Sequence, residues 1–120
     1  MQNREALWKK SELEAADWFL SRNRALLLAR NFRVKQGELD LIFEEELPEG
    51  SIELVFAEVR TRSLDGWVSA LESVTYGKRL RLSRAIQAYL LRYRGRATSL
   101  RIDILARDGE EWTQVRNIVI

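Results

Sequence analysis

The sequence predicts an α/β fold of order α-β-β-β-α-β-β, in which a mixed β-sheet is flanked by helices. Residues 5–21 have apolar side chains at helical spacing, with no Gly or Pro. Residues 52–60 are apolar on both faces, which is typical of a central strand covered on both sides. A long amphipathic segment, 73–93, separates this strand from the next, 100–106, and indicates a parallel crossover between them. A chain of 120 residues is expected to form a single domain, 1–120.

The other elements follow from short apolar runs and the turn residues between them. The second helix is expected to bury Leu80, Leu82, Ile86, Ala88, Tyr89 and Leu90. In chain order, the remaining elements are a strand over 25–34, a turn at 35–37, a strand over 38–45, a turn at 48–51, a loop that could move over 61–69, a turn at 107–111 and a last strand through 112–120.

The composition restricts the chemistry that is available. The chain has no Cys and no His, which excludes disulfides and thiolate metal sites and removes the commonest general base. Any bound metal must therefore be hard and oxygen-liganded, as Mg²⁺ or Mn²⁺ would be. The N-terminal segment has charges throughout, and no apolar run reaches membrane-spanning length. We therefore expect a cytoplasmic protein with no signal peptide and no membrane contact.

The charge is distributed unevenly along the chain, although the net charge is only +2. Residues 37–59 contain eight acids and no base, whereas residues 73–102 contain eight bases and no acid. Seven of these bases are Arg, whose planar fork suits phosphate. A basic helix beside an acidic sheet edge is a plausible nucleic-acid footprint. The alternative is that the two blocks neutralise each other across the fold, and charge alone does not separate the two.

Acidic residues interrupt two strands that otherwise resemble core. Because strand side chains alternate, Glu38, Asp40 and Ile42 are expected on one face, and Glu58 and Arg60 together on a face of the partner strand. Pairing of the two strands would bring Asp40 and Glu58 together. Two close, half-buried carboxylates repel, so one stays protonated unless a cation joins them. That cation is either a divalent metal or Arg60.

Two interpretations of these acids remain open from spacing alone. Asp40 and Glu58 are a sufficient protein contribution to a Mg²⁺ site in a metal-dependent phosphodiesterase, since this ion keeps several waters. Alternatively, Glu58 and Arg60 form an ion pair that fixes strand register, or the acids face solvent. Acid-x-base triplets are common on strands, which favours the structural interpretation.

Five motifs occur in order and cover nearly the whole chain from Glu12 onward. Together they closely resemble the YraN-like family of small, uncharacterised bacterial proteins. That family is placed in the restriction-endonuclease-like, PD-(D/E)XK superfold and is similar to archaeal Holliday-junction resolvases. The motifs are "RNFR" at 30–33, "GELDLI" at 37–42, "AEVRTR" at 57–62, "GKRLRLSRAIQAYL" at 77–90 and "RIDILA" at 101–106.

The resemblance implies a restriction-endonuclease-like core with a Mg²⁺ or Mn²⁺ site at Asp40 and Glu58, and Glu12 on the first helix as a third acid. The sequence departs from the family at Arg60, where Lys is usual. Arg stays charged, so Arg60 can hold a phosphate or stabilise a transition state but cannot act as a base. Lys78 could supply the missing amine. Analogy with the resolvases also suggests a homodimer.

The expected function is nucleic-acid binding, most simply of DNA, with divalent-metal-dependent endonuclease activity on structured or branched DNA. The alternative is a non-catalytic nucleic-acid-binding or interaction domain on a degenerate nuclease scaffold, and a third class is a purely structural partner protein. Trp67 either stacks on a base or folds back onto the sheet. The expected contacts to nucleic acid are Lys78, Arg79, Arg81, Arg84 and Trp67.

Two further pairs are expected to serve the structure. Trp18 and Trp112 are predicted to pack in the core or at the sheet edge. Arg101 and Asp103 share a face of one strand and are predicted to form an ion pair within the sheet.

Overall fold

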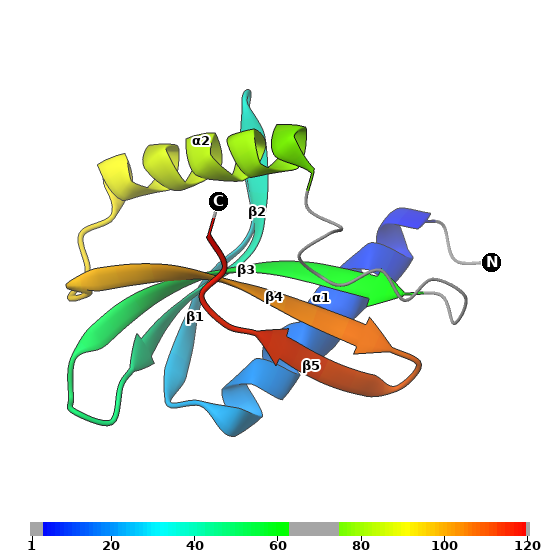
Figure 1. The fold of residues 1–120 in the computed structure, drawn as a ribbon, viewed down its shortest axis with the longest axis horizontal. Coiled ribbons are helices and arrows are strands. Elements are labelled where there is room, and N and C mark those ends of the chain that lie inside the picture. Colours follow the sequence, from blue (N-terminus) through cyan, green and yellow to red (C-terminus); the bar gives the residue numbers. More distant parts are fainter. Residues whose placement is uncertain (1–3, 63–74, 120) are drawn as a thin grey trace.

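The computed structural model describes residues 4–62 and 75–119, and its elements follow the predicted order. No helix in these two ranges is long and apolar enough to cross a membrane. The elements are α1 (Arg4–Arg22), β1 (Ala25–Val34), β2 (Gly37–Glu46), β3 (Ile52–Arg62), α2 (Tyr76–Arg92), β4 (Ser99–Asp108) and β5 (Glu111–Val115) (Figure 1).

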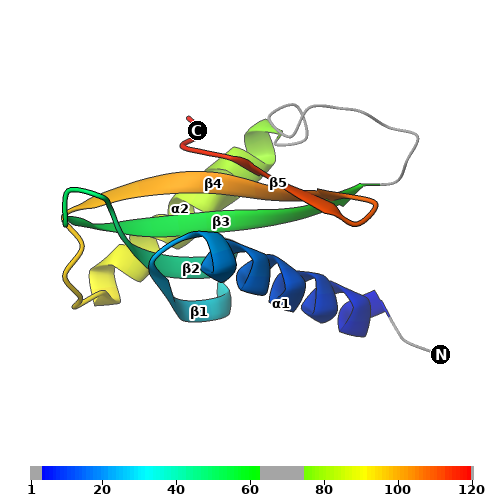
Figure 2. The same cartoon turned by 90° about the horizontal axis from the view of Figure 1, so that it is seen from below.

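The strands form one mixed five-stranded sheet in the order β1-β2-β3-β4-β5. β3 and β4 pair in parallel, and the other neighbours pair antiparallel. α2 makes the crossover between β3 and β4, which confirms the predicted parallel pair. The two helices lie on opposite faces of the sheet, with α1 in front of the strands and α2 behind them in Figure 2. The architecture is therefore a mixed α/β fold.

The core has two layers, one on each face of the sheet. β3 contributes to both: Leu54 and Phe56 pack toward α2, while Val55 and Ala57 pack toward α1. This confirms that β3 is a central strand covered on both sides. The prediction that Leu80 and Leu90 of α2 are buried is wrong, because these side chains are 38% and 37% exposed.

Several element boundaries differ from the prediction. α2 begins at Tyr76, because Thr75 caps it by accepting a hydrogen bond from the Lys78 amide. β3 continues through Arg62, so the first two residues of the predicted loop are strand; Trp67 and the rest of that loop lie outside the described residues. β5 ends at Val115, because the chain turns at Asn117 (φ 58°).

Both structural pairs are confirmed. The rings of Trp18 and Trp112 have centroids 6.5 Å apart, at the edge of the α1-side core. Arg101 is buried, and its Nε lies 3.0 Å from Oδ1 of Asp103. Arg101 also pairs with Glu45 and Glu53, two of the acids from the 37–59 block. Part of the acidic block is therefore neutralised within the fold.

Candidate active site

Asp40 of β2 and Glu58 of β3 meet at one end of the sheet, as the sequence predicts. Their carboxyl groups share a hydrogen bond. Regular pairing of β2 with β3 ends at Leu41 and Ala57. Beyond that point Oδ2 of Asp40 accepts a hydrogen bond from the Val59 amide at 2.9 Å. The side chain of Asp40 thus bonds to the β3 backbone just beyond the last regular pair of β2 and β3 residues.

The local course of β2 differs from the prediction. Leu39 and Ile42 both belong to the α2-side core, whereas Leu41 belongs to the α1-side core. The alternation of side chains is therefore broken at Asp40. The expectation that Asp40 and Ile42 share a face is wrong, because Asp40 lines a cavity beside Glu12 of α1.

Glu12 brings a third carboxylate to this cavity, as the resemblance implies. Its side chain is only 9% exposed, although it lines the cavity together with Asp40 and Glu58. The side chain of Asn31 in β1 lies beside it, close enough to favour its ionised form. Within the described part of the chain its Oε2 is buried and has no hydrogen-bond partner. An unsatisfied buried carboxylate oxygen is costly and is typical of a site that a ligand completes.

The clustering of acids perturbs their ionisation. Burial, followed by the negative charge of Asp40, raises the pKa of Glu58 to about 8. Burial also raises the pKa of Asp40 and, together with the charge of Asp40, the pKa of Glu12. These causes are desolvation and like-charge repulsion, which both disfavour the ionised form. Near neutral pH, the Asp40–Glu58 pair therefore shares one proton.

Arg60 also reaches the carboxyl pair. Its Nη2 lies 3.0 Å from Oε1 of Glu58, and both side chains are largely buried. Arg60 lines the α1-side cavity with Glu12 and Asp40, and it also lines a second cavity beneath α2. Arg60, one of the two cations that the sequence allows beside Glu58, is thus placed to balance the charge of Glu58 when that carboxyl is ionised.

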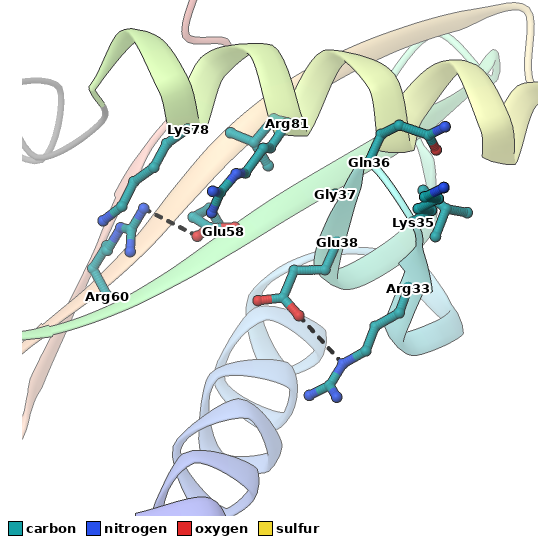
Figure 3. Close-up of a pocket in the computed structure, with 11 residues that line it drawn as sticks. Arg33, Lys35, Gln36, Gly37, Glu38, Glu58, Arg60, Lys78 and Arg81 are labelled. Carbon is teal, nitrogen blue, oxygen red and sulfur yellow. Dashed lines mark ion pairs between the residues drawn. The ribbon is translucent and has the colours of Figure 1, made fainter.

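The second cavity, of about 400 Å³, is bordered by bases. Lys78 and Arg81 extend into it from α2, above Glu58 and Arg60 (Figure 3). The first cavity, of about 320 Å³, adjoins it along four shared residues, Arg33, Glu38, Glu58 and Arg60, and we call the two cavities together the cleft. We call Lys78 and Arg81 the basic wall of this cleft. Arg79 and Arg84 are exposed on α2 but do not line either cavity.

The hairpin between β1 and β2 holds the basic wall in place. A Cβ built on Gly37 would lie 2.1 Å from the backbone oxygen of Arg81. The hairpin rises past α2 in Figure 1, and its turn touches the helix at this glycine. Sequence reasoning treated Gly37 only as a turn residue and missed this contact. It also missed Asn31, although Asn is uncommon inside strands and its place in β1 was a usable signal.

The donors in the cleft suit a hard divalent cation. Carboxylate oxygens are the ligands that Mg²⁺ and Mn²⁺ prefer, and Oε2 of Glu12 is unsatisfied among the described residues. In residues 4–62 and 75–119, no group of three or more acidic side chains is already arranged to hold a metal. A metal ion here would therefore be mostly hydrated and would depend on the two carboxylates of Asp40 and Glu58, with Glu12 beside them.

Comparison with known proteins identifies the family. Residues 12–106 match the model of the uncharacterised protein family UPF0102. A UPF0102 protein of Halorhodospira halophila is 44% identical over 104 residues, covering 87% of this chain and 79% of its own length. A UPF0102 protein of Janthinobacterium is 38% identical, covering 84% and 77%. One from Aliivibrio fischeri strain MJ11 is 32% identical, covering 99% and 95%. The chain belongs to the UPF0102 family.

Proposed function

We propose that this member of family UPF0102 is a nucleic-acid-binding protein with a restriction-endonuclease-like core and divalent-metal-dependent endonuclease activity on structured or branched DNA. One observation carries the proposal: Glu58, whose carboxyl group interacts with that of Asp40, lies beneath the basic wall of Lys78 and Arg81 (Figure 3). A phosphodiester in this cleft would have bases on one side and metal-binding oxygens on the other.

Each residue of the cleft has a distinct role in this proposal. Asp40 and Glu58 would hold Mg²⁺ or Mn²⁺ and release their shared proton when the ion binds. The bound ion would supply Lewis-acid polarisation of the phosphoryl oxygens. Lys78 and Arg81 would contact phosphates, as sequence-independent positioning groups. Lys78 also provides an amine at the cleft that could hold or move a proton, a task for which the permanently charged Arg60 is unsuited.

A second function is favoured by the ion pair between Arg60 and Glu58. Because Nη2 of Arg60 already lies 3.0 Å from Glu58, it partly balances the charge that a metal would balance. In a non-catalytic nucleic-acid-binding or interaction domain, Arg60 would serve instead as a fixed phosphate-binding fork. Both functions use the same cleft, and they differ in whether the backbone of the nucleic acid is cut.

The decisive experiment measures binding and cleavage separately, on duplex, single-stranded and four-way-junction DNA with Mg²⁺ or Mn²⁺. The variant Arg60→Lys restores a compact amine beside Glu58. For an endonuclease weakened by Arg60, we expect cleavage to rise by about 10²–10⁴-fold, the usual contribution of a positioned proton-transfer group. Affinity should change little, because both residues carry one positive charge.

The double variant Arg60→Lys with Asp40→Ala is the control, and it should lose the gain. Cleavage at background in Arg60→Lys, with weaker DNA binding, would overturn the endonuclease and support the binding domain. A gain that survives Asp40→Ala would show a contaminating nuclease. DNA affinity that does not depend on salt in any variant would overturn both functions and leave a structural partner protein.

A matched pair of charge reversals tests the basic wall. Arg81→Glu, inside the cleft, should weaken binding to all sequences alike and lower the salt dependence by at least one ionic contact. Arg84→Glu, on the exposed surface of the same helix, should have a smaller effect. Equal effects of the two reversals would show that the whole helix face, rather than the cleft, contacts the nucleic acid.

A further inference from the structure

Asn31 has a backbone conformation that needs an explanation. It lies inside β1, yet its φ is 52°, in the left-handed region that residues other than Gly seldom adopt. Asn tolerates this region better than most residues because its short polar side chain can bond locally. A left-handed residue in the interior of a strand is therefore a local distortion that the surrounding structure maintains.

The distortion coincides with Asp40 on the neighbouring strand. Asn31 lies between the pairs Arg30–Leu41 and Phe32–Leu39, and is therefore opposite Asp40. β1 breaks its alternation here, since residues 29 and 32 both pack against the α2-side core. β2 breaks its alternation at Asp40 itself. Both strands of the hairpin are thus irregular at one level, where Asp40 turns toward Glu58 and the Val59 amide.

The side chain of Asn31 acts at the same point. It lines the cavity with Glu12 and Asp40, and it lies close enough to Glu12 to favour the ionised form of that carboxylate. Glu12 comes from α1, whereas Asp40 comes from β2, so Asn31 contacts an acid from one element and lies across from an acid of another. One oxygen of the buried Glu12 carboxylate has no hydrogen-bond partner among the described residues.

We propose that Asn31 is the positioning residue of the carboxylate cluster: its left-handed backbone turns Asp40 toward Glu58, and its amide holds Glu12 beside them. The proposal rests on the proposed function only in that the cluster binds a cation. Hydrogen-bonding groups that orient metal ligands typically contribute about 10–100-fold to metal affinity. Asn31 would act through the acids without touching the substrate.

Two substitutions test the backbone conformation of Asn31 and its side-chain amide separately. Asn31→Gly keeps the left-handed conformation and removes the amide, whereas Asn31→Ala removes the amide and disfavours the conformation. Asn117→Gly is the matched control, because Asn117 is also left-handed (φ 58°) but lies beside Asp103, outside the cleft. The measurements are Mn²⁺ affinity, from the electron paramagnetic resonance signal of free Mn²⁺, and hydrogen exchange of the Val59 amide, which reports the bond to Asp40.

We expect Asn31→Gly to lower Mn²⁺ affinity about tenfold or more with Val59 still protected. Asn31→Ala should lower the affinity further and accelerate Val59 exchange, and Asn117→Gly should match the wild type. Wild-type affinity and exchange in both Asn31 variants would overturn the positioning role. If Asn31→Ala fails to fold, the test rests on Asn31→Gly. Wild-type Mn²⁺ affinity in that variant would show that the side-chain amide does not position the carboxylates.

The failure of the proposed function gives a different result. If the wild type binds no Mn²⁺, or binds it equally well after Asp40→Asn, the metal site is wrong. Val59 exchange then decides the backbone role alone. Faster exchange in Asn31→Ala than in Asn31→Gly supports that role, and equal exchange overturns it.

Discussion

Because the pKa of Glu58 is higher in the folded than in the unfolded protein, we predict that the metal-free protein loses stability as the pH rises from about 5 to about 8. In the unfolded chain the carboxyl of Glu58 ionises near its usual pKa of 4.5, whereas in the fold burial and the charge of Asp40 raise the pKa to about 8. Between these values the folded state binds more protons than the unfolded state, so each increase in pH favours unfolding. Above the folded pKa the loss is complete, and below the unfolded pKa it is absent.

The magnitude follows from the size of the perturbation. One pKa unit corresponds to about 1.36 kcal/mol, so a rise from 4.5 to about 8 sets an upper bound of roughly 5 kcal/mol. We expect about 2–3 kcal/mol, because the cleft admits water and ionised groups in proteins are partly relaxed by it. Of the charged side chains around Glu58, Asp40, Glu38 and Glu12 oppose its ionisation. Arg60, Lys78 and Arg81 face it from β3 and α2 and favour its ionisation.

The assay is urea unfolding at pH 5, 6, 7, 8 and 9 without divalent ions. Glu58→Gln removes the titrating group but keeps a side chain that can bond to Asp40, so its stability should depend much less on pH. Glu49→Gln is the control, since Glu49 is fully exposed and its pKa is lowered by the Ser51 hydroxyl. Parallel pH curves for the wild type and Glu58→Gln, or a wild-type stability that rises over this range, would refute the reasoning.

Addition of Mn²⁺ extends the same experiment. At pH 8 a metal that binds the folded pair should restore stability, by about 2.7 kcal/mol at a concentration 100 times its Kd. At pH 5 the effect should be much smaller, because protons compete for the same carboxylates. A Mn²⁺ effect of equal size in Asp40→Asn would place the ion elsewhere.

Two further predictions concern the scaffold. Gly37→Ala places a Cβ 2.1 Å from the backbone oxygen of Arg81, so we expect a loss of about 1–3 kcal/mol in unfolding free energy and weaker DNA binding as the helix shifts. Gly77→Ala, with open space around it, should be neutral or stabilising by up to about 1 kcal/mol; equal losses would refute the contact. Arg101→Met should cost about 3–5 kcal/mol by leaving buried carboxylates unpaired. Arg33→Met breaks only an exposed ion pair and should cost less than about 1 kcal/mol, and similar costs for the two would show that Arg101 is not the centre of a buried network.

The sequence predicted the elements well wherever local pattern and tertiary packing agree. β3 is apolar on both faces, and a strand of that kind has few alternatives to the centre of a covered sheet. The crossover followed from the helix between two strands. At the ends of elements the prediction was less accurate. The cap at Thr75 and the left-handed turn at Asn117 end regular structure at positions where the apolar pattern continues.

The sequence also identified Asp40 and Glu58 as candidate site residues, but it did not predict how the side chain of Asp40 is oriented. A carboxylate on a buried strand is costly, so Asp40 and Glu58 stood out from their apolar neighbours. Their convergence followed from hairpin pairing. The break in alternation at Asp40 was not predictable, because it depends on Asn31, which is nine residues earlier in the chain and adopts φ 52°. Alternation rules assume a regular strand, and the site occurs where the strand is irregular.

In the proposed function, phosphate binding and metal binding are assigned to different elements of the cleft. The acids come from α1, β2 and β3, whereas the basic wall comes from α2, and Gly37 connects the two parts by touching the backbone of Arg81. A change at Gly37 should therefore move the bases relative to the acids and affect both functions together. Arg60 differs from Gly37 in this respect. Its side chain lines both cavities and pairs with Glu58, which lies on the same strand, so it does not hold α2 against the sheet. The chemistry of the cleft can thus be altered through Arg60 while the scaffold that presents it stays in place.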